Sequence, residues 1–109
     1  MIPLKVKPLS VNGAYRGRRF ATQELKDYKL ELSLRLPKKI VIPEGKLKVV
    51  YIFGISSKNG DGDNLIKAFQ DCVADKYGFN DKRIYKWDVE KVDVPKGKEF
   101  INFDILKWQ

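Results

Sequence analysis

Two aspartates and an asparagine crowd into a short turn near the middle of the chain. Asp61 and Asp63 are separated by Gly62, and Asn64 follows directly. A single acidic or amide side chain suffices to cap a helix N-terminus, because it accepts hydrogen bonds from free amides. Two carboxylates and an amide are more than a cap requires, and the two carboxylates repel each other unless a cation lies nearby. Oxygen ligands grouped in this way suit Mg²⁺. The residues alone leave metal binding and simple capping equally open.

The composition removes most other catalytic chemistry. The 109 residues include no histidine and one cysteine, Cys72. Histidine bases, most transition-metal sites, an internal disulfide and a thiolate zinc cluster are therefore excluded. The helical spacing of Cys72 beside Phe69 and Val73 predicts a small core residue. The remaining chemistry must use carboxylates, lysines, hydroxyl groups and a metal.

The charge balance points to a polyanionic partner. The chain has 22 Lys and Arg against 14 Asp and Glu, a formal net charge of +8. Nucleic acid is the first candidate, and an acidic membrane surface is the second. The basic residues are scattered rather than aligned on one helix face, which disfavours the membrane surface. Since neither a signal peptide nor a membrane-spanning stretch is apparent, we expect a cytoplasmic protein without a membrane partner.

A basic and aromatic segment lies early in the chain. It contains Tyr15, Arg16, Arg18 and Arg19. Arginine forks onto phosphate oxygens, and tyrosine stacks on a base or donates to a phosphate. A solvated basic loop is the alternative interpretation. In a chain of this charge we predict contact with DNA phosphates.

Apolar periodicity predicts the elements that must position these residues. A short edge strand is expected over 2–6 and a largely buried strand over 46–55. Helices are expected over 22–36 and from the acidic turn to Gly78, a usual helix-ending residue. Residues 40–42 are candidates for a further short strand.

The first helix carries two sets of apolar residues. Its main stripe predicts the buried face and consists of Leu25, Tyr28, Leu32 and Leu36. Leu30 and Leu34 lie off that stripe, which predicts contact with a second neighbour.

The last third of the chain alternates apolar and polar residues in two runs. These runs predict a hairpin that turns at 95–98. The element order is then β-α-β-α-β-β. We therefore predict one α+β domain over 1–109, with helices packed on a mixed sheet.

A third carboxylate, Asp81, follows the second helix. Asn80 and Asp81 can simply form a turn into the next strand. A helix of about sixteen residues spans ~24 Å, so Asp81 leaves the end opposite Asp61 and Asp63. It can join them only from a second protein copy or after the chain folds back. The sequence leaves both arrangements open.

These motifs together resemble the RusA-type Holliday junction resolvases. The resemblance begins with residues 9–12, followed closely by Tyr15 and Arg16. It continues through Asp-Gly-Asp-Asn-Leu-Ile-Lys over 61–67, which is similar to the family's Asp-x-Asp-Asn-Leu-x-Lys signature. It ends with Gly-Phe-Asn-Asp over 78–81, so it covers most of the chain in the family's order.

The resemblance implies a magnesium-dependent endonuclease. Such an enzyme acts as a homodimer on four-way DNA junctions in recombination and repair, with one nick per subunit. By this resemblance the metal ligands are Asp61, Asp63 and Asp81, and Lys67 completes the catalytic set. Lys67 is suited to hold the scissile phosphate or stabilise the leaving oxygen. Its alternative role is an ion pair with Asp63, worth only ~0.5 kcal/mol on an exposed helix.

Other positions support or depart from the family pattern. Asn64 and Asp71 match family residues, and we expect supporting roles for them. Asn80 stands where the family usually has an acid, and Arg83 stands where a glutamine is common. Asn80 can still ligate a metal through its amide oxygen. A non-catalytic DNA-binding module, with the acids serving only as a helix cap, is the alternative function.

Overall fold

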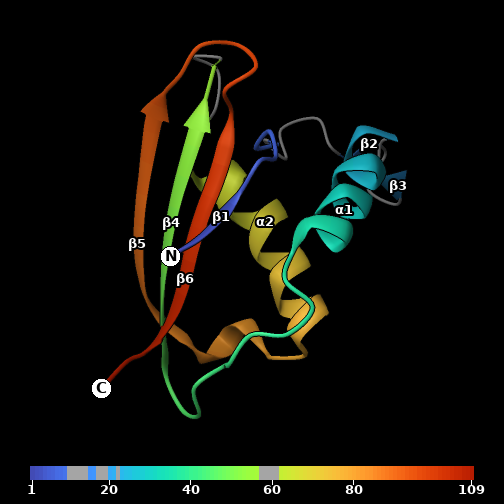
Figure 1. Cartoon of the computed structure of the whole chain (residues 1–109). Coiled ribbons are helices and arrows are strands. Elements are labelled where there is room, and N and C mark those ends of the chain that lie inside the picture. Colours follow the sequence, from blue (N-terminus) through green and yellow to red (C-terminus); the bar gives the residue numbers. More distant parts are fainter. Residues whose placement is uncertain (10–14, 17–19, 22, 57–61) are drawn as a thin grey trace.

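The fold is built around one apolar strand, β4 (Leu47–Ile55), in the interior of a four-stranded sheet (Figure 1). The computed structural model describes residues 1–9, 15–16, 20–21, 23–56 and 62–109. The strand order is β1-β6-β4-β5. Strand β5 runs parallel to β4, whereas β6 runs antiparallel to both β4 and β1. The predicted α+β class, mixed sheet and edge position of the first strand are confirmed.

The other strands and the helices have the following residue ranges. Strand β1 is Ile2–Leu4, β5 is Ile84–Asp93 and β6 is Phe100–Lys107. Helix α1 is Gln23–Arg35 and helix α2 is Gly62–Tyr77. A two-residue ladder, β2 (Tyr15–Arg16) with β3 (Phe20–Ala21), precedes α1 and was not foreseen. None of the helices in the described ranges is long and apolar enough to cross a membrane.

The predicted C-terminal hairpin is wrong. Both β5 and β6 pair with β4, one on each side, so they do not pair with each other. The segment between them crosses the end of β4, where the Val94 amide donates to the Ile55 carbonyl (2.8 Å). The side chains of β4 explain its interior place, because Leu47, Val49 and Tyr51 are fully buried. The charged and exposed β5 suits a sheet edge.

Both helices cover the same face of the sheet (Figure 1). Phe69 of α2 lies at the centre of the core between them and the sheet. Its ring packs edge-on against Tyr51, Phe53 and Phe103, with ring centroids 5.3, 6.1 and 5.4 Å away. Such tilted contacts are favourable aromatic geometry. They fix α2 against the strands that carry its neighbours.

Two smaller expectations for the first half are wrong. The main apolar stripe of α1 is buried as predicted, but Leu30 and Leu34 are 61% and 77% exposed. These two side chains therefore do not make the expected second contact with the described residues, although α1 does lie against both α2 and β3. Residues 40–42 do not form a strand, although Ile40 and Ile42 pack against the core. Flanking prolines, which lack an amide donor, explain why this short segment does not join a sheet.

The chain folds back sharply after α2. Helix α2 ends at Tyr77, and Gly78 follows with a positive φ of 68°, which confirms the predicted end of the helix. A 3₁₀ turn, η1 (Asp81–Arg83), then leads into β5. The Arg83 guanidinium anchors this turn by donating to the carbonyls of Gly45 (2.9 Å) and Pro43. Arg83 thus fixes the turn that carries Asp81.

Candidate functional site

A cavity of about 560 Å³ opens where α2, the 3₁₀ turn and β5 meet. It contains three of the predicted site residues, Lys67, Asp71 and Asp81. Asp81 reaches the cavity because the chain folds back after α2. Folding back within one chain brings Asp81 to Lys67 and Asp71, whereas the side chains of Asp61 and Asp63, which the two open arrangements concerned, lie outside the described part.

Lys67 and Asp71 form an ion pair one helical turn apart. The Lys67 ammonium lies 3.6 Å from an oxygen of Asp71, and the two side chains are 62% and 40% exposed. An exposed pair of this type contributes at most about 0.5 kcal/mol. A phosphate can therefore draw the ammonium away from Asp71 at little cost. The alternative partner, Asp63, has a side chain outside the described part.

A buried polar network forms the inner wall of the cavity. The Gln70 side-chain oxygen accepts hydrogen bonds from the Tyr51 hydroxyl (3.0 Å) and from the Trp87 indole N–H (2.9 Å). Gln70 is only 8% exposed. Burial raises the pKa of Tyr51, and the negative charge of Asp81 raises that pKa further. Tyr51 therefore remains a neutral hydrogen-bond donor.

Sequence reasoning missed Gln70 and Trp87 as site residues. In the alternating run that predicts the hairpin, Trp87 falls among the apolar positions, and no motif in the sequence includes Gln70. One signal was present, because Gln70 directly follows the buried Phe69 on the inner side of an amphipathic helix. A polar side chain in such a position requires a hydrogen-bond partner.

Asn80 faces a different cavity from Asp81. This second cavity, of about 360 Å³, is also lined by Lys46, Lys82, Arg83 and Tyr85. The Asn80 side-chain oxygen accepts a hydrogen bond from the Lys82 amide (2.9 Å) and caps the 3₁₀ turn. The structure thus gives Asn80 the turn-forming role that the sequence had offered as its plain alternative.

The other predicted residues cannot be placed at the level of side chains. Asp63 and Asn64 belong to the first turn of α2, and Tyr15 and Arg16 belong to β2. Their side chains lie outside the described part, as do the whole residues Asp61, Arg18 and Arg19. Among the described residues, no group of three or more candidate ligands is arranged to hold a metal ion. Metal binding by Asp61 and Asp63 stays a prediction.

The described part of the site contains one free-standing candidate ligand for Mg²⁺ and one group suited to a phosphate. Asp81 supplies a carboxylate, the ligand type that Mg²⁺ prefers. Lys67 supplies an ammonium that binds phosphate as a point charge. Cys72 offers no competing nucleophile, because burial raises the pKa of its thiol to about 11 and the side chain packs against the core.

In comparisons with known proteins, no family model and no curated protein matches the chain.

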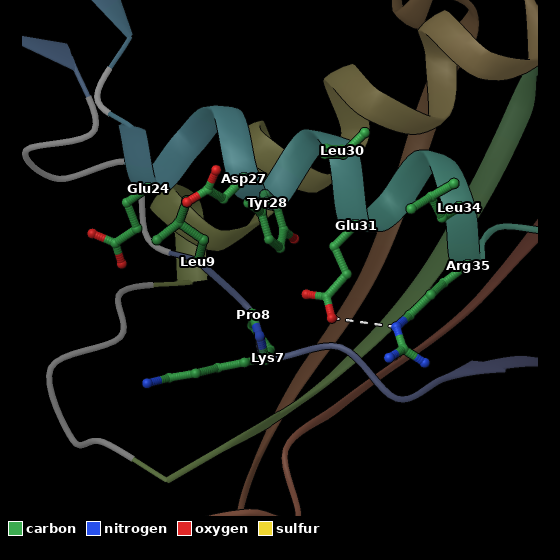
Figure 2. A pocket seen from close by; sticks show the side chains of 10 residues that line it. All are labelled: Lys7, Pro8, Leu9, Glu24, Asp27, Tyr28, Leu30, Glu31, Leu34 and Arg35. Atoms are coloured by element: carbon green, nitrogen blue, oxygen red, sulfur yellow. Dashed lines mark hydrogen bonds and ion pairs between the residues drawn. The ribbon is translucent and has the colours of Figure 1, made fainter.

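A larger cavity lies apart from these residues, between α1 and residues 7–9 (Figure 2). Its volume is about 660 Å³. Its charged lining comprises the acidic Glu24, Asp27 and Glu31 and the basic Lys7 and Arg35. Glu31 is already paired with Arg35 at 3.3 Å. An acidic lining of this kind disfavours a polyanion, so we do not assign this cavity to DNA.

Proposed function

We propose that the protein is a magnesium-dependent endonuclease that resolves four-way DNA junctions. The observation that carries this proposal is the grouping of Lys67, Asp71 and Asp81 in one cavity of a protein with a net charge of +8. Hydrolysis of a phosphodiester requires neutralisation of the charge that develops on the phosphate. The resemblance to the RusA-type resolvases supports the junction substrate, the homodimer and a role in cytoplasmic DNA repair.

The proposed roles follow from the chemistry of each side chain. Asp61, Asp63 and Asp81 would hold Mg²⁺, and the bound ion would supply Lewis-acid chemistry at the phosphate. Lys67 leaves its exposed pair with Asp71 and binds a phosphate oxygen instead. Before substrate binds, Asp71 holds and orients the Lys67 ammonium through this pair.

A non-catalytic DNA-binding module is the second candidate. Two site residues favour it, because both already make structural interactions: Asn80 caps the 3₁₀ turn, and Lys67 forms an ion pair with Asp71. A magnesium titration with labelled DNA separates the two functions. A nuclease cuts only when Mg²⁺ is added and stops when a chelator removes it. A binding module retains DNA in both conditions and never cuts.

The basic segment should make the binding strongly dependent on salt. Replacing Arg16 and Arg18 together with Ala should weaken DNA binding and flatten the plot of log affinity against log salt. Each lost phosphate contact reduces the slope by ~0.9, so the double variant should lose about 1.8. Titrations at several salt concentrations measure this. The matched control replaces Lys38 and Lys39, which are exposed in the connection after α1. Equal slopes for the two double variants would refute a specific phosphate contact.

Each active site of the proposed dimer should be complete within one chain. Mixing an Asp63→Asn chain with an Asp81→Asn chain should not restore cutting, because Asp81 shares its cavity with Lys67 and Asp71 of its own chain. Mixing either variant with the wild-type chain provides the control, since those mixed dimers should make single nicks. Sedimentation verifies that each mixture is dimeric, and single nicks from the wild-type mixtures verify that chains exchange. Recovered cutting in the double-variant mixture would mean that sites are shared between subunits.

A further inference from the structure

The Trp87 side chain is held by a hydrogen bond from its indole N–H and is partly exposed to solvent. Its N–H donates to Gln70, whose position is in turn fixed by the buried Tyr51 hydroxyl. Trp87 nevertheless remains 44% exposed. Burying an amide such as Gln70 is costly unless its groups are hydrogen-bonded. A buried polar side chain, Gln70, therefore holds the exposed ring of Trp87 in one orientation.

The open side of Trp87 faces the candidate site. The ring lines the same cavity as Lys67, Asp71 and Asp81. An aromatic face next to groups suited to a phosphate can receive the base that belongs to that phosphate. Base–aromatic stacking of this kind tolerates any sequence, because every base has a π-face.

A second aromatic side chain continues this surface along β5. The pairing of β5 with β4 shifts by one residue, so that Ile84 and Lys86 have partners in β4 and Tyr85 is the extra residue between them. Such bulges redirect a side chain. Tyr85 is 57% exposed and lines the neighbouring cavity beside Lys82, with the Lys46 ammonium 4.8 Å from its ring centroid.

A purely structural role explains Trp87 less well. An aliphatic side chain would protect the edge of the core at this position without a buried amide to hold it. A structural tryptophan would also bury most of its ring, whereas nearly half of Trp87 is exposed. The cations beside both rings match the alternation of aromatic and basic groups found in single-strand binding surfaces.

Taking its substrate from the proposed nuclease function, we propose that Trp87 stacks on an unpaired base adjacent to the phosphate in the cavity. Gln70 is the positioning residue for the indole. The basic residues Lys46 and Lys82 bind the next phosphate along the same strand. The surface along β5 therefore recognises unpaired nucleotides, as at a branch point, rather than paired duplex.

Intrinsic fluorescence tests this contact directly. The chain has two tryptophans, so a Trp108→Phe variant carries Trp87 alone. This protein is titrated in a chelator, where no cutting occurs, with a single-stranded oligonucleotide and with a duplex of equal length. Binding is followed independently by anisotropy of the labelled DNA. Stacking predicts strong quenching of Trp87 by the single strand and little by the duplex. Saturated single-strand binding without quenching would overturn the proposal.

Affinity measurements on variants provide the second arm. Trp87→Ala should weaken single-strand binding by about 5- to 100-fold, whereas Trp87→Phe should recover most of the affinity. Gln70→Leu should lower single-strand affinity and reduce the quenching of Trp87 at saturation, because the indole loses its fixed orientation. Circular dichroism confirms that each variant is folded. Equal single-strand affinity for Trp87→Ala and the parent protein would also overturn the proposal.

These results can be told apart from a failure of the nuclease assignment. Quenching in chelator together with no cutting in Mg²⁺ would support base stacking and refute the nuclease. Cutting in Mg²⁺ without quenching would support the nuclease and refute base stacking.

Discussion

Replacing Asp81 with Asn is expected to abolish cutting of a four-way junction while leaving junction binding equal or tighter. The substitution keeps the shape of the side chain but removes one negative charge from the cavity that holds Lys67. Cutting should fall at least about 100-fold, the typical effect of removing one electrostatic group from a transition state. Binding should not weaken, because a charge that repels phosphate has been removed. Cutting rates in Mg²⁺ and affinities in chelator measure the two effects.

Asp88→Asn provides the matched control for this experiment. Asp88 is exposed on β5 directly after Trp87, so its side chain points to the sheet face opposite the helices. The change of charge is the same, but it lies away from the cavity. Asp88→Asn should therefore cut normally. Near-normal cutting by Asp81→Asn, or an equal loss in both variants, would contradict the assigned role of Asp81.

Phe69→Ala should cause the largest loss of stability among single substitutions in the core. The ring is fully buried and packs edge-on against three other aromatic rings. Replacing a buried phenylalanine with alanine typically lowers the free energy of unfolding by about 3–5 kcal/mol, because transfer and cavity costs add. A domain of ordinary stability has only about 5–15 kcal/mol in total. Urea unfolding, followed by circular dichroism, measures the change.

Leu34→Ala is the control for this substitution. It also truncates a large apolar side chain on a helix, but Leu34 is 77% exposed. Its effect should stay within about 0.5 kcal/mol, as is usual for surface positions. A loss below about 1 kcal/mol for Phe69→Ala would show that Phe69 is not central to the core.

Local patterns predicted the helices and the interior strand well, but not the pairing of the last strands. The periodicity of Leu25, Tyr28 and Leu32 is a property of one helix, so it can be seen in a short window of sequence. Strand pairing is different, because β5 and β6 each satisfy their backbone groups with β4 rather than with their neighbour in the chain. The alternation within each run predicts a strand but does not identify its partner.

The candidate site was also predicted only in part. Lys67 and Asp71 became candidates through the resemblance, as did Asp81. Their meeting with Asp81 depends on the anchoring of the 3₁₀ turn by Arg83, whose partners lie some forty residues earlier in the chain. Trp87 was missed because its contact with Gln70 exists only after β5 pairs with β4.

The central claim is tested most directly by mapping cuts in a four-way junction labelled in turn on each strand. The protein is incubated with the junction in Mg²⁺ and, in parallel, in chelator, with a linear duplex of the same sequence as the control. We predict symmetric nicks in two opposing strands of the junction, in Mg²⁺ only, and no comparable cutting of the duplex. A junction that is fully bound yet uncut in Mg²⁺, or a duplex cut as fast as the junction, would contradict the proposed function.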